Sequence, residues 1–362
     1  MYIKNITLNN FKNFENSEYS FSKINCIVGD NGVGKTNILD AIYYLSFCRS
    51  FLGSNDGDMI NYGKDFFSVK GEFLNENTQI SDEGDIYVIS LKKNERKVLK
   101  HGKQPYKKFS EHIGKIPCVV VSPIDHIYIT GRSEQRRKFM DIVLAQTDTV
   151  YMDCLINYNK CLEQRNKLLK YFQQTQVYDT VQLEIYNEQL ASYSAKIQSK
   201  RRVFFDEFIT PFRNYYEYIS DSKEQVDVVY KSYDGDLSEV LLKNYEKEKI
   251  LGHTTQGIHR DDLVFQLNSH EVNHIASQGQ QKTFLLALKL AQFDYIKQHT
   301  HTHPILLLDD IFDKFDFSRV TKVLQLMAQD DFLQVFITDT QYDRVEKIIP
   351  QAKKDESKII RL

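Results

Sequence analysis

The chain has 362 residues, of which 41% are hydrophobic and 12% aromatic, enough to build a core, so a wholly disordered protein is excluded. Lysine and arginine number 47 and aspartate and glutamate 49, a formal net charge of -2 that excludes a uniformly basic nucleic-acid coat protein and leaves room for a local basic patch. The five cysteines include no CxxC pair, which disfavours disulfides and a cysteine zinc site and predicts a reducing, cytoplasmic location.

The first part of the chain is predicted to be rich in strands. Alternating residues over 2–21 predict two strands, and the apolar run 24–28 predicts a buried third strand. After a glycine-rich turn, residues 37–51 have apolar side chains at helical spacing. Short alternating runs over 66–98 predict an antiparallel sheet. No apolar run approaches about 18 residues, so no membrane span is expected, and the N-terminus has no signal-peptide pattern.

The middle of the chain predicts a helical arm. A buried strand is expected at 115–122, and helical spacing follows over about 133–171 and 179–213. Pro211 lies near the expected end of the second stretch. The two stretches together predict an antiparallel pair of helices.

The last third returns to alternating helices and apolar strands. Such strands are typical of a parallel sheet that is covered on both faces. The expected helices are 279–297 and 319–329, and the expected strands are 304–310 and 334–338.

Residues 29–36, GDNGVGKT, match the phosphate-loop pattern G-x-x-x-x-G-K-[ST] in full. Glycines let backbone N–H groups approach phosphate oxygens, and the following helix presents its positive end to them. Lys35 is expected at the β- and γ-phosphates and the Thr36 hydroxyl at Mg²⁺. A helix-capping glycine turn is the simpler alternative, but it does not account for the strand before and the helix after. The predicted nucleotide-binding residues are Gly29, Asp30, Asn31, Gly32, Val33, Gly34, Lys35, Thr36 and Asn37.

A second motif follows the aliphatic run 305–308, which ends in two carboxylates. Ligands bind at the carboxyl ends of strands in open parallel sheets. Asp309 is therefore expected to hold Mg²⁺ directly or through water, and Asp310 to polarise the attacking water. Many buried strands end in aspartate, so this motif gains its meaning from the phosphate loop in the same chain.

Residues 277–282, SQGQQK, precede a predicted helix. Ser277 could simply cap that helix. A serine, a glycine and a helix N-terminus together also form an anion site, so the sequence alone leaves both interpretations open.

These motifs resemble those of ATP-binding-cassette (ABC) ATPases, with SQGQQK similar to the signature motif and LLLDD to the Walker B motif. The opening residues 1–21 resemble the first strands of the SMC and RecF group. Three stretches, 122–141, 257–263 and 277–291, resemble the RecF family of bacterial recombinational-repair ATPases. An SMC subunit would also need hundreds of residues of heptads, which this chain lacks.

The resemblance implies an α/β fold, namely a two-lobed ABC-type ATPase head of the P-loop NTPase class with a short antiparallel helical arm. Lobe I is expected to comprise 1–110 and 300–362, with both Walker motifs. Lobe II is expected to comprise 111–299, with the arm at about 133–213 and the signature motif.

The resemblance also implies ATP and Mg²⁺ as cofactors and an ATP-dependent homodimer. Ser277, Gly279 and Gln280 would bind the ATP of a partner subunit, and residues 313–316 would form the D-loop at the same interface. Hydrolysis would release the dimer. The implied role is recombinational repair and replication-fork maintenance at gapped or junction DNA, where the protein would help load recombinase together with RecO and RecR.

Three positions depart from the family pattern. Lys12 stands where the family usually has arginine, which replaces a planar fork with a point charge. Asp310 replaces the glutamate of most ABC ATPases, and its shorter reach predicts slow hydrolysis. Asp339 and Thr340 stand where transporter cassettes have a switch histidine, so the sequence does not identify a γ-phosphate sensor there.

Clusters of basic residues are the candidates for DNA binding, because Lys and Arg on one face attract phosphates. They offer no base-reading geometry, so recognition of DNA structure is expected. The alternatives are solvated helix faces and internal ion pairs. The candidates are Arg132, Arg136, Arg137, Lys138, Lys200, Arg201 and Arg202.

Other functions are weighed against this one. The main alternative is the ATPase subunit of a related nuclease or defence system, which would act through a partner enzyme. A transporter cassette is disfavoured because the switch histidine is missing, and a small-molecule kinase because it needs no signature motif. Residues 259–262, HRDD, are interpreted as structural or interface-forming, and the HTHTH run at 299–303 as an exposed turn rather than a metal site.

Overall fold

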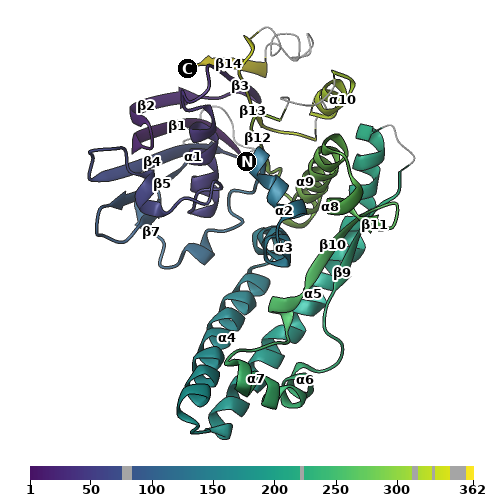
Figure 1. Cartoon of the computed structure of the whole chain (residues 1–362). Helices are drawn as coiled ribbons and strands as arrows, with labels where there is room; N and C mark the ends of the chain where they lie inside the picture. The colour runs from purple at the N-terminus through teal and green to yellow at the C-terminus, as the bar shows by residue number, and fades with distance from the viewer. Residues whose placement is uncertain (76–83, 221–223, 312–316, 328–330, 343–355) are drawn as a thin grey trace. The chain divides into compact units, whose positions relative to one another are not determined.

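Figure 1 shows the protein as a computed structural model that describes residues 1–75, 84–220, 224–311, 317–327, 331–342 and 356–362. The chain forms two compact units. Unit 1 comprises residues 1–125, 215–222 and 278–362, and unit 2 comprises residues 126–214 and 223–277. Within the described ranges, no helix has the length and apolarity needed to cross a membrane.

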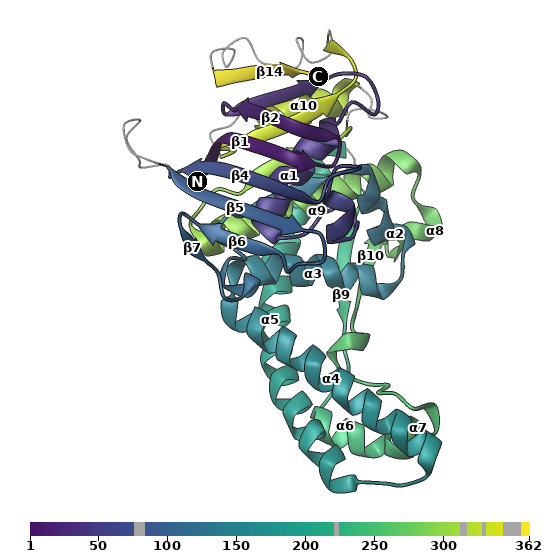
Figure 2. The same ribbon diagram turned by 90° about the vertical axis from the view of Figure 1, so that its left-hand side faces the viewer.

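Unit 1 contains an antiparallel sheet with the strand order β2-β1-β4-β5-β6-β7. Figure 2 shows these strands stacked in that order. Alternating burial along β1 and β4 places one face of this sheet against the core, as the alternating sequence predicts. The strands are β1 (Tyr2–Phe11), β2 (Phe14–Ser20), β4 (Phe66–Leu74), β5 (Asp85–Lys92), β6 (Val98–His101) and β7 (Gln104–Pro105).

The second sheet of unit 1 has the order β14-β3-β13-β12-β8, and all its pairs are parallel. Four of these strands, β3, β8, β12 and β13, are buried nearly throughout, which explains their continuous apolar runs. Its strands are β3 (Ile24–Val28), β8 (Cys118–Val121), β12 (Ile305–Leu308), β13 (Val335–Asp339) and β14 (Ser357–Arg361).

The side chain of Gln334 joins the two sheets. Its Oε1 accepts the backbone N–H of Ile3 at 2.9 Å, and its Nε2 donates to the Ile3 carbonyl at 2.8 Å and to the Ser22 carbonyl at 3.0 Å. A buried amide that completes its hydrogen bonds in this way fixes the edge of β1 against the start of β13.

Among the described residues of unit 1, the α-helices are α1 (Lys35–Phe47), α9 (Gln278–Thr300), α10 (Phe317–Met327) and the last residues, 215–220, of a helix that begins in unit 2. Helix α1 contacts both sheets, and eleven of its thirteen residues are buried, so it is a central helix rather than an amphipathic surface helix. On α9, Lys289 makes a buried ion pair of 2.9 Å with Asp125, just after β8.

The observed division differs from the expected lobes in three places, one of which is residues 215–222, which belong to unit 1 although they were expected in lobe II. Strand β8 hydrogen-bonds along its length to β12, so it belongs to unit 1 and not to the part expected from residue 111 onward. Helix α9 also belongs to unit 1, although it was expected in lobe II, because it packs on β8. Long-range strand pairing of this kind has no local sequence signal.

Unit 2 contains the predicted helical arm, formed by α4 (Thr149–Thr175) and the part of α5 (Thr180–Ser220) that precedes residue 215. The two helices lie side by side, with α6 (Leu237–Lys243) and α7 (Tyr245–Leu251) against them (Figures 1 and 2). Helix α5 contains Pro211 and continues to Ser220, beyond its expected end at about 213. Before α4, helix α3 (Ser133–Thr147) ends at Asp148, whose carboxylate caps α4 by accepting the Tyr151 N–H at 2.9 Å.

A small antiparallel sheet with the order β11-β10-β9 completes unit 2. Its strands are β9 (Val226–Lys231), β10 (Asp262–Leu267) and β11 (His270–Glu271), and short helices α2 (Ile127–Thr130), α8 (Val272–Ile275) and the 3-10 turn η4 (Ile258–Arg260) flank it. The five cysteines of the chain are free and buried.

Candidate functional site

The phosphate loop joins β3 to α1 and adopts a backbone that requires glycine. Gly34 has φ +115°, and a Cβ there would lie 2.6 Å from the side-chain nitrogen of Asn13. Asn13 braces the loop by donating to the Val33 carbonyl at 2.8 Å and accepting from the Asn37 side chain at 2.7 Å. No sequence pattern indicates this role of Asn13, because it depends on the hairpin β1–β2 lying beside the loop.

Lys35 lies across the loop that precedes it. Its ammonium donates to the carbonyls of Gly29 at 2.8 Å and Asp30 at 3.0 Å, and the residue is 5% exposed. A buried ammonium needs such partners. Both partners are backbone carbonyls of the loop itself, so the cation stays next to the anion site that the loop forms.

The two predicted Walker motifs meet through a direct hydrogen bond. The Thr36 hydroxyl lies 2.8 Å from Oδ1 and 3.1 Å from Oδ2 of Asp309 and donates to this carboxylate, although 273 positions separate the two residues. Asp309 is 4% exposed. Burial raises the pKa of its carboxyl, and the hydrogen bonds from Thr36 and Thr338 oppose that rise.

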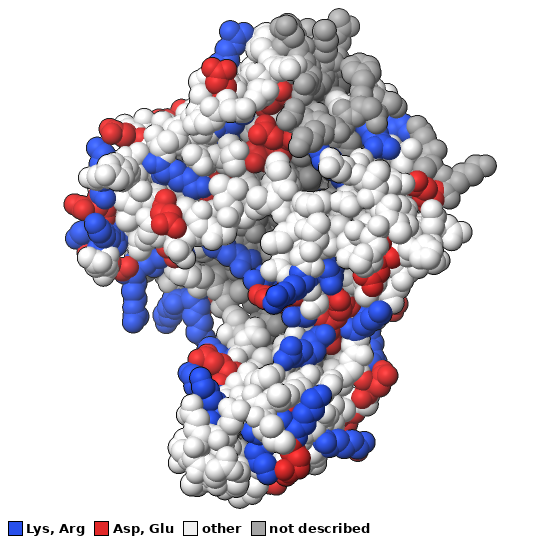
Figure 3. All heavy atoms as spheres, viewed as in Figure 1, with Lys and Arg blue, Asp and Glu red and all other residues white. Residues whose placement is uncertain are grey.

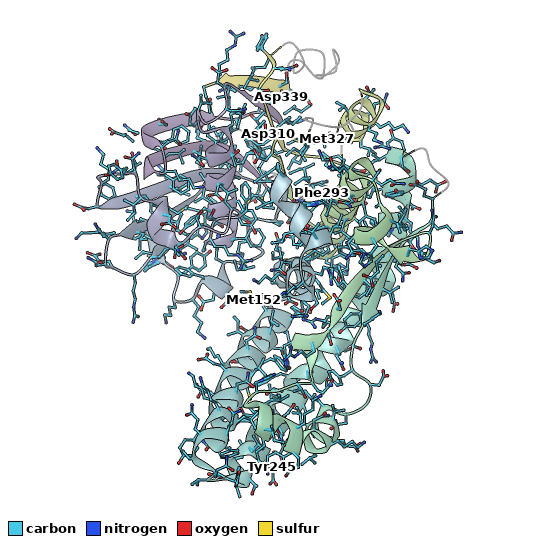
Figure 4. The ribbon with its side chains drawn as sticks, viewed as in Figure 1. Met152, Tyr245, Phe293, Asp310, Met327 and Asp339 are labelled. Atoms are coloured by element: carbon cyan, nitrogen blue, oxygen red, sulfur yellow. The ribbon has the colours of Figure 1, made fainter. Side chains whose placement is uncertain are left out.

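The site lies at one edge of the parallel sheet. Strands β3, β12 and β13 run parallel, so the phosphate loop, the Asp309–Asp310 pair and Asp339 all follow carboxyl ends at the same edge. Figure 4 shows Asp310 and Asp339 close together there. This is the edge at which ligands bind in open parallel sheets.

The residues at this edge fit a magnesium nucleotide. A hydroxyl and a carboxylate, from Thr36 and Asp309, are the hard oxygen ligands that Mg²⁺ prefers. The glycine backbone, with positive φ at Gly32 and Gly34, and the start of α1 form an anion site of the phosphate-loop kind. The predicted nucleotide and metal residues are therefore brought together.

The signature stretch is divided between the two units. Ser277 is the last residue of unit 2, whereas Gly279 and Gln280 lie in the first turn of α9 in unit 1. A Cβ on Gly279 would lie 2.9 Å from Nη1 of Arg319, at the start of α10. The structure thus adds a nearby cation that the sequence motif did not reveal. The expected D-loop, residues 313–316, lies outside the described residues.

Lys12, one of the three positions that depart from the family pattern, forms an ion pair within the protein. Its ammonium lies 2.5 Å from the buried carboxylate of Asp40 on α1. Asp40 also accepts the Ser50 hydroxyl at 2.8 Å and the Phe51 N–H at 2.9 Å. With the Lys12 ammonium, the buried carboxylate has three donors, so a single point charge serves where a planar fork is usual in the family.

Two of the basic candidates for DNA binding make internal contacts in unit 2. Arg136 forms a bidentate pair with Asp262, with Nε and Nη2 at 2.8 and 2.9 Å from its carboxylate oxygens. Arg137 donates to the Asp261 carbonyl at 2.6 Å. Both side chains thus join α3 to the start of β10, Arg136 to its first residue and Arg137 to the residue before it.

Arg201 is 1% exposed and lies inside unit 2. It donates to Asp261 at 2.6 Å, to Asp141 at 2.9 Å and to the Tyr151 hydroxyl at 3.1 Å. A guanidinium with these partners does not reach a DNA phosphate in this structure, and its prediction as a DNA contact is corrected here. The basic residues 200–202 look alike in sequence, so the sequence does not distinguish the buried Arg201 from its exposed neighbours. Which side of a helix is buried depends on what packs against it.

The exposed candidates are Arg132, Lys138, Lys200 and Arg202. Lys138 pairs with Glu134 and Lys200 with Asp148, at 2.8 and 2.7 Å, and both lysines are more than half exposed. On the face shown in Figure 3, Lys and Arg along the arm alternate with Asp and Glu. This face of the arm therefore has mixed charge.

Replacing Arg201 with Met should lower the free energy of unfolding by about 3–5 kcal/mol, because it leaves two carboxylates of a buried ion network without their partner. Urea unfolding followed by circular dichroism measures this loss. Arg202→Met, at the exposed neighbouring position, is the control and should change stability by no more than about 0.5 kcal/mol. Equal effects of the two variants would contradict the structural role of Arg201.

Two further stretches singled out in the sequence contain histidines, HRDD at 259–262 and HTHTH at 299–303. The imidazole of His259 lies 2.8 Å from the Tyr158 hydroxyl, and burial lowers its pKa to about 4. In the HTHTH run, α9 extends to Thr300, and His301 is exposed with φ +53°. Across the part of the chain that the structure describes, no three His, Cys, Asp or Glu residues are grouped to hold a metal ion.

Comparisons with known proteins agree with this geometry. The model of the RecF/RecN/SMC N-terminal domain family matches residues 2–356. The DNA replication and repair protein RecF of Flavobacterium johnsoniae is 45% identical over 352 residues, which are 96% of this chain and 97% of that protein. Its counterpart in Bacteroides thetaiotaomicron is 44% identical over 358 residues, 98% and 95% of the two chains.

Solved structures extend the similarity to the fold. The recombination mediator protein RecF-ATPrS of the RecFOR pathway matches with a TM-score of 0.86 and 28% identity, covering 100% of this chain and 96% of that chain. The Smc head domain of Pyrococcus furiosus matches with a TM-score of 0.56 and 19% identity, covering 96% and 91%. The second similarity concerns the fold alone.

Proposed function

The chain belongs to the RecF family of ABC-type ATPases of DNA replication and repair, and on this premise we propose that ATP makes two copies close on DNA. The dimer would bind single-strand/double-strand junctions such as gaps, in recombinational repair and at replication forks. Slow ATP hydrolysis would release it, after it has helped load recombinase with RecO and RecR. The observation that carries the ATP-dependent part is the Thr36–Asp309 hydrogen bond, which joins the two nucleotide motifs at one sheet edge.

Each residue of the site has a role in this proposal. The phosphate loop would bind the α- and β-phosphates through its N–H groups. The Lys35 ammonium, which donates to two loop carbonyls, would donate instead to oxygens of the β- and γ-phosphates. Thr36 and Asp309 would hold Mg²⁺, which when bound neutralises charge on the phosphates. Asp310, half-buried beside Asp309, would orient the attacking water. Its side chain is one carbon shorter than glutamate, in keeping with slow turnover.

Dimerisation is the proposed role of the signature residues. Ser277, Gly279 and Gln280 of one copy would bind the γ-phosphate held by the other copy, which gives two equivalent sites about a two-fold axis. The positive end of the 23-residue helix α9 supports an anion-binding role for its first turn. Loss of the γ-phosphate would then remove a contact that exists only in the dimer.

The proposed DNA contacts are the exposed cations of unit 2, Arg132, Lys138, Lys200 and Arg202. Arg132 precedes the first residue of α3 and the other three lie on helices. They can meet phosphates but present no paired donors for a base edge, so binding independent of sequence is expected. Because the chain is close to neutral, the affinity should depend on these few contacts and fall with salt.

No observation favours the alternative of a nuclease or defence ATPase subunit. That class would share the phosphate loop and the Asp309–Asp310 pair. The two curated relatives described above, which cover 96% and 98% of this chain, are named as DNA replication and repair proteins.

The experiment that tests the proposal is fluorescence anisotropy with gapped and fully duplex DNA, with and without Mg-ATP. Wild type should bind gapped DNA at least about tenfold more tightly with ATP, a coupling of about 1.4 kcal/mol. Ser277→Arg should bind ATP normally but show neither the ATP-dependent gain nor a dimer by analytical ultracentrifugation, because a bulky cation fills the proposed γ-phosphate site. ATP-driven dimers in this variant would refute the trans role, and binding that ignores ATP in wild type would refute the clamp.

A further inference from the structure

We propose that Thr338, on β13, is a positioning residue of the ATPase site: its hydroxyl holds Asp309 and the backbone of Asp310 in their working geometry. The proposal rests on the roles assigned above to Asp309 and Asp310. Thr338 lies outside the nucleotide motifs, and in the sequence it is far from the phosphate loop.

Strand pairing places Thr338 beside the two carboxylates. Leu308, the last residue of β12, pairs with Ile337 of β13, so Thr338 and Asp309 are the next positions on adjacent parallel strands. Thr338 is fully buried. The side chain therefore faces Asp309 from within the sheet and not from solvent.

One hydroxyl of Thr338 makes two different hydrogen bonds. It donates to Oδ1 of Asp309 at 2.9 Å and accepts the backbone N–H of Asp310, also at 2.9 Å. A hydroxyl has one donor and can accept at the same time, so both bonds form together. The same atom thus sets the direction of one carboxylate and the path of the chain that carries the other.

The second of these bonds matters because the backbone at Asp310 is unusual. Asp310 has φ +47°, in the left-handed region that L-residues rarely adopt. Asp309 still donates its N–H to Val121 of β8, so the departure from the sheet begins at Asp310. The Thr338 hydroxyl binds the first N–H of this departure and so fixes where the Asp310 side chain starts. Strained backbone of this kind persists only where its surroundings hold it.

Thr338 also gives Asp309 a support separate from the proposed metal ligand. Asp309 accepts from two hydroxyls, those of Thr36 and Thr338. Thr36 is expected to bind Mg²⁺, whereas Thr338 belongs to the sheet interior. Outer partners of this type orient metal-binding carboxylates, and their loss commonly costs about 10- to 100-fold in metal affinity or activity.

The test compares four side chains at this position by steady-state ATPase kinetics and by binding of a fluorescent ATP analogue with Mg²⁺. Thr338→Val keeps the shape and removes the hydroxyl, and Thr338→Ser keeps the hydroxyl and removes the methyl. We expect Thr338→Val to lower kcat by about 10-fold or more while KM and analogue affinity change by less than about 3-fold, and Thr338→Ser to stay within about 3-fold of wild type. Thr338→Ala against Thr338→Ser makes the same comparison with smaller side chains, should the valine variant fail to fold.

The control is Ser46→Ala, which removes another buried hydroxyl of unit 1, one that bonds the Ile116 carbonyl at 2.5 Å. It should lower the melting temperature as the Thr338 variants do and leave kcat within about 2-fold. A wild-type kcat in Thr338→Val and Thr338→Ala, or equal losses in the serine and alanine variants, would overturn the proposal. Absence of ATP turnover in wild type would instead overturn the function on which it rests.

Discussion

Lys35→Met should weaken ATP binding by about 100-fold, because charge-assisted hydrogen bonds contribute about 1.5–3 kcal/mol and no neutral side chain of this length replaces them. In the structure the ammonium already lies against the loop, bonded to the Gly29 and Asp30 carbonyls. The variant therefore loses both the cation expected at the phosphates and the hydrogen bonds that join the two loop carbonyls. Isothermal titration with Mg-ATP measures the loss.

The matched control is Lys23→Met, which removes the same charge from a half-exposed lysine paired with Glu356 at the surface. It should leave the affinity for ATP within about 2-fold, since exposed ion pairs contribute little. Without tight ATP binding, Lys35→Met should also fail to dimerise and should bind gapped DNA equally with and without ATP. Unchanged ATP affinity in this variant would rule out residues 29–36 as the nucleotide site.

Asp310→Asn should keep ATP binding and lower the hydrolysis rate by about 100-fold or more, the range of a lost general base. The amide keeps the size of the side chain and the Thr338 contact to the backbone N–H, but it is far weaker as a base. Because the γ-phosphate is then retained, the ATP dimer should persist on gel filtration in Mg-ATP for much longer than the wild-type dimer.

The control for this variant is Asp331→Asn, at an exposed carboxylate that pairs with Lys297. It should leave turnover and dimer lifetime near wild type. Undiminished turnover in Asp310→Asn would remove Asp310 from catalysis. Slow turnover together with a short-lived dimer would separate hydrolysis from release and contradict the proposed switch.

Local patterns predicted the secondary structure around the phosphate loop. The glycines, Lys35 and Thr36 lie within eight consecutive residues, and the structure confirms the strand before them and the helix after them. The buried strands that carry Asp309 and Asp339 were expected within one or two residues, because continuous aliphatic runs have few other uses in an α/β protein.

Other elements escaped prediction for physical reasons. Strand β9, VDVVYK at 226–231, lies between polar flanks and pairs with β10, which begins 31 positions further along the chain. Helix α5 extends beyond its expected end at 213, and buried aromatic residues on both sides of Pro211, Phe208 and Phe212, pack there. At Pro211 tertiary packing overrides local propensity.

The sequence by itself determined the family and the ATPase activity, and it predicted the phosphate-loop and carboxylate residues, because these depend on short motifs with fixed spacing. Only the tertiary structure decided which distant groups lie in contact: Thr36 with Asp309, Thr338 with both aspartates, and Arg201 with the acidic groups inside unit 2. Hydrogen bonds and burial join residues by distance in space, and strand order and helix packing set that distance. No local pattern of residues records it.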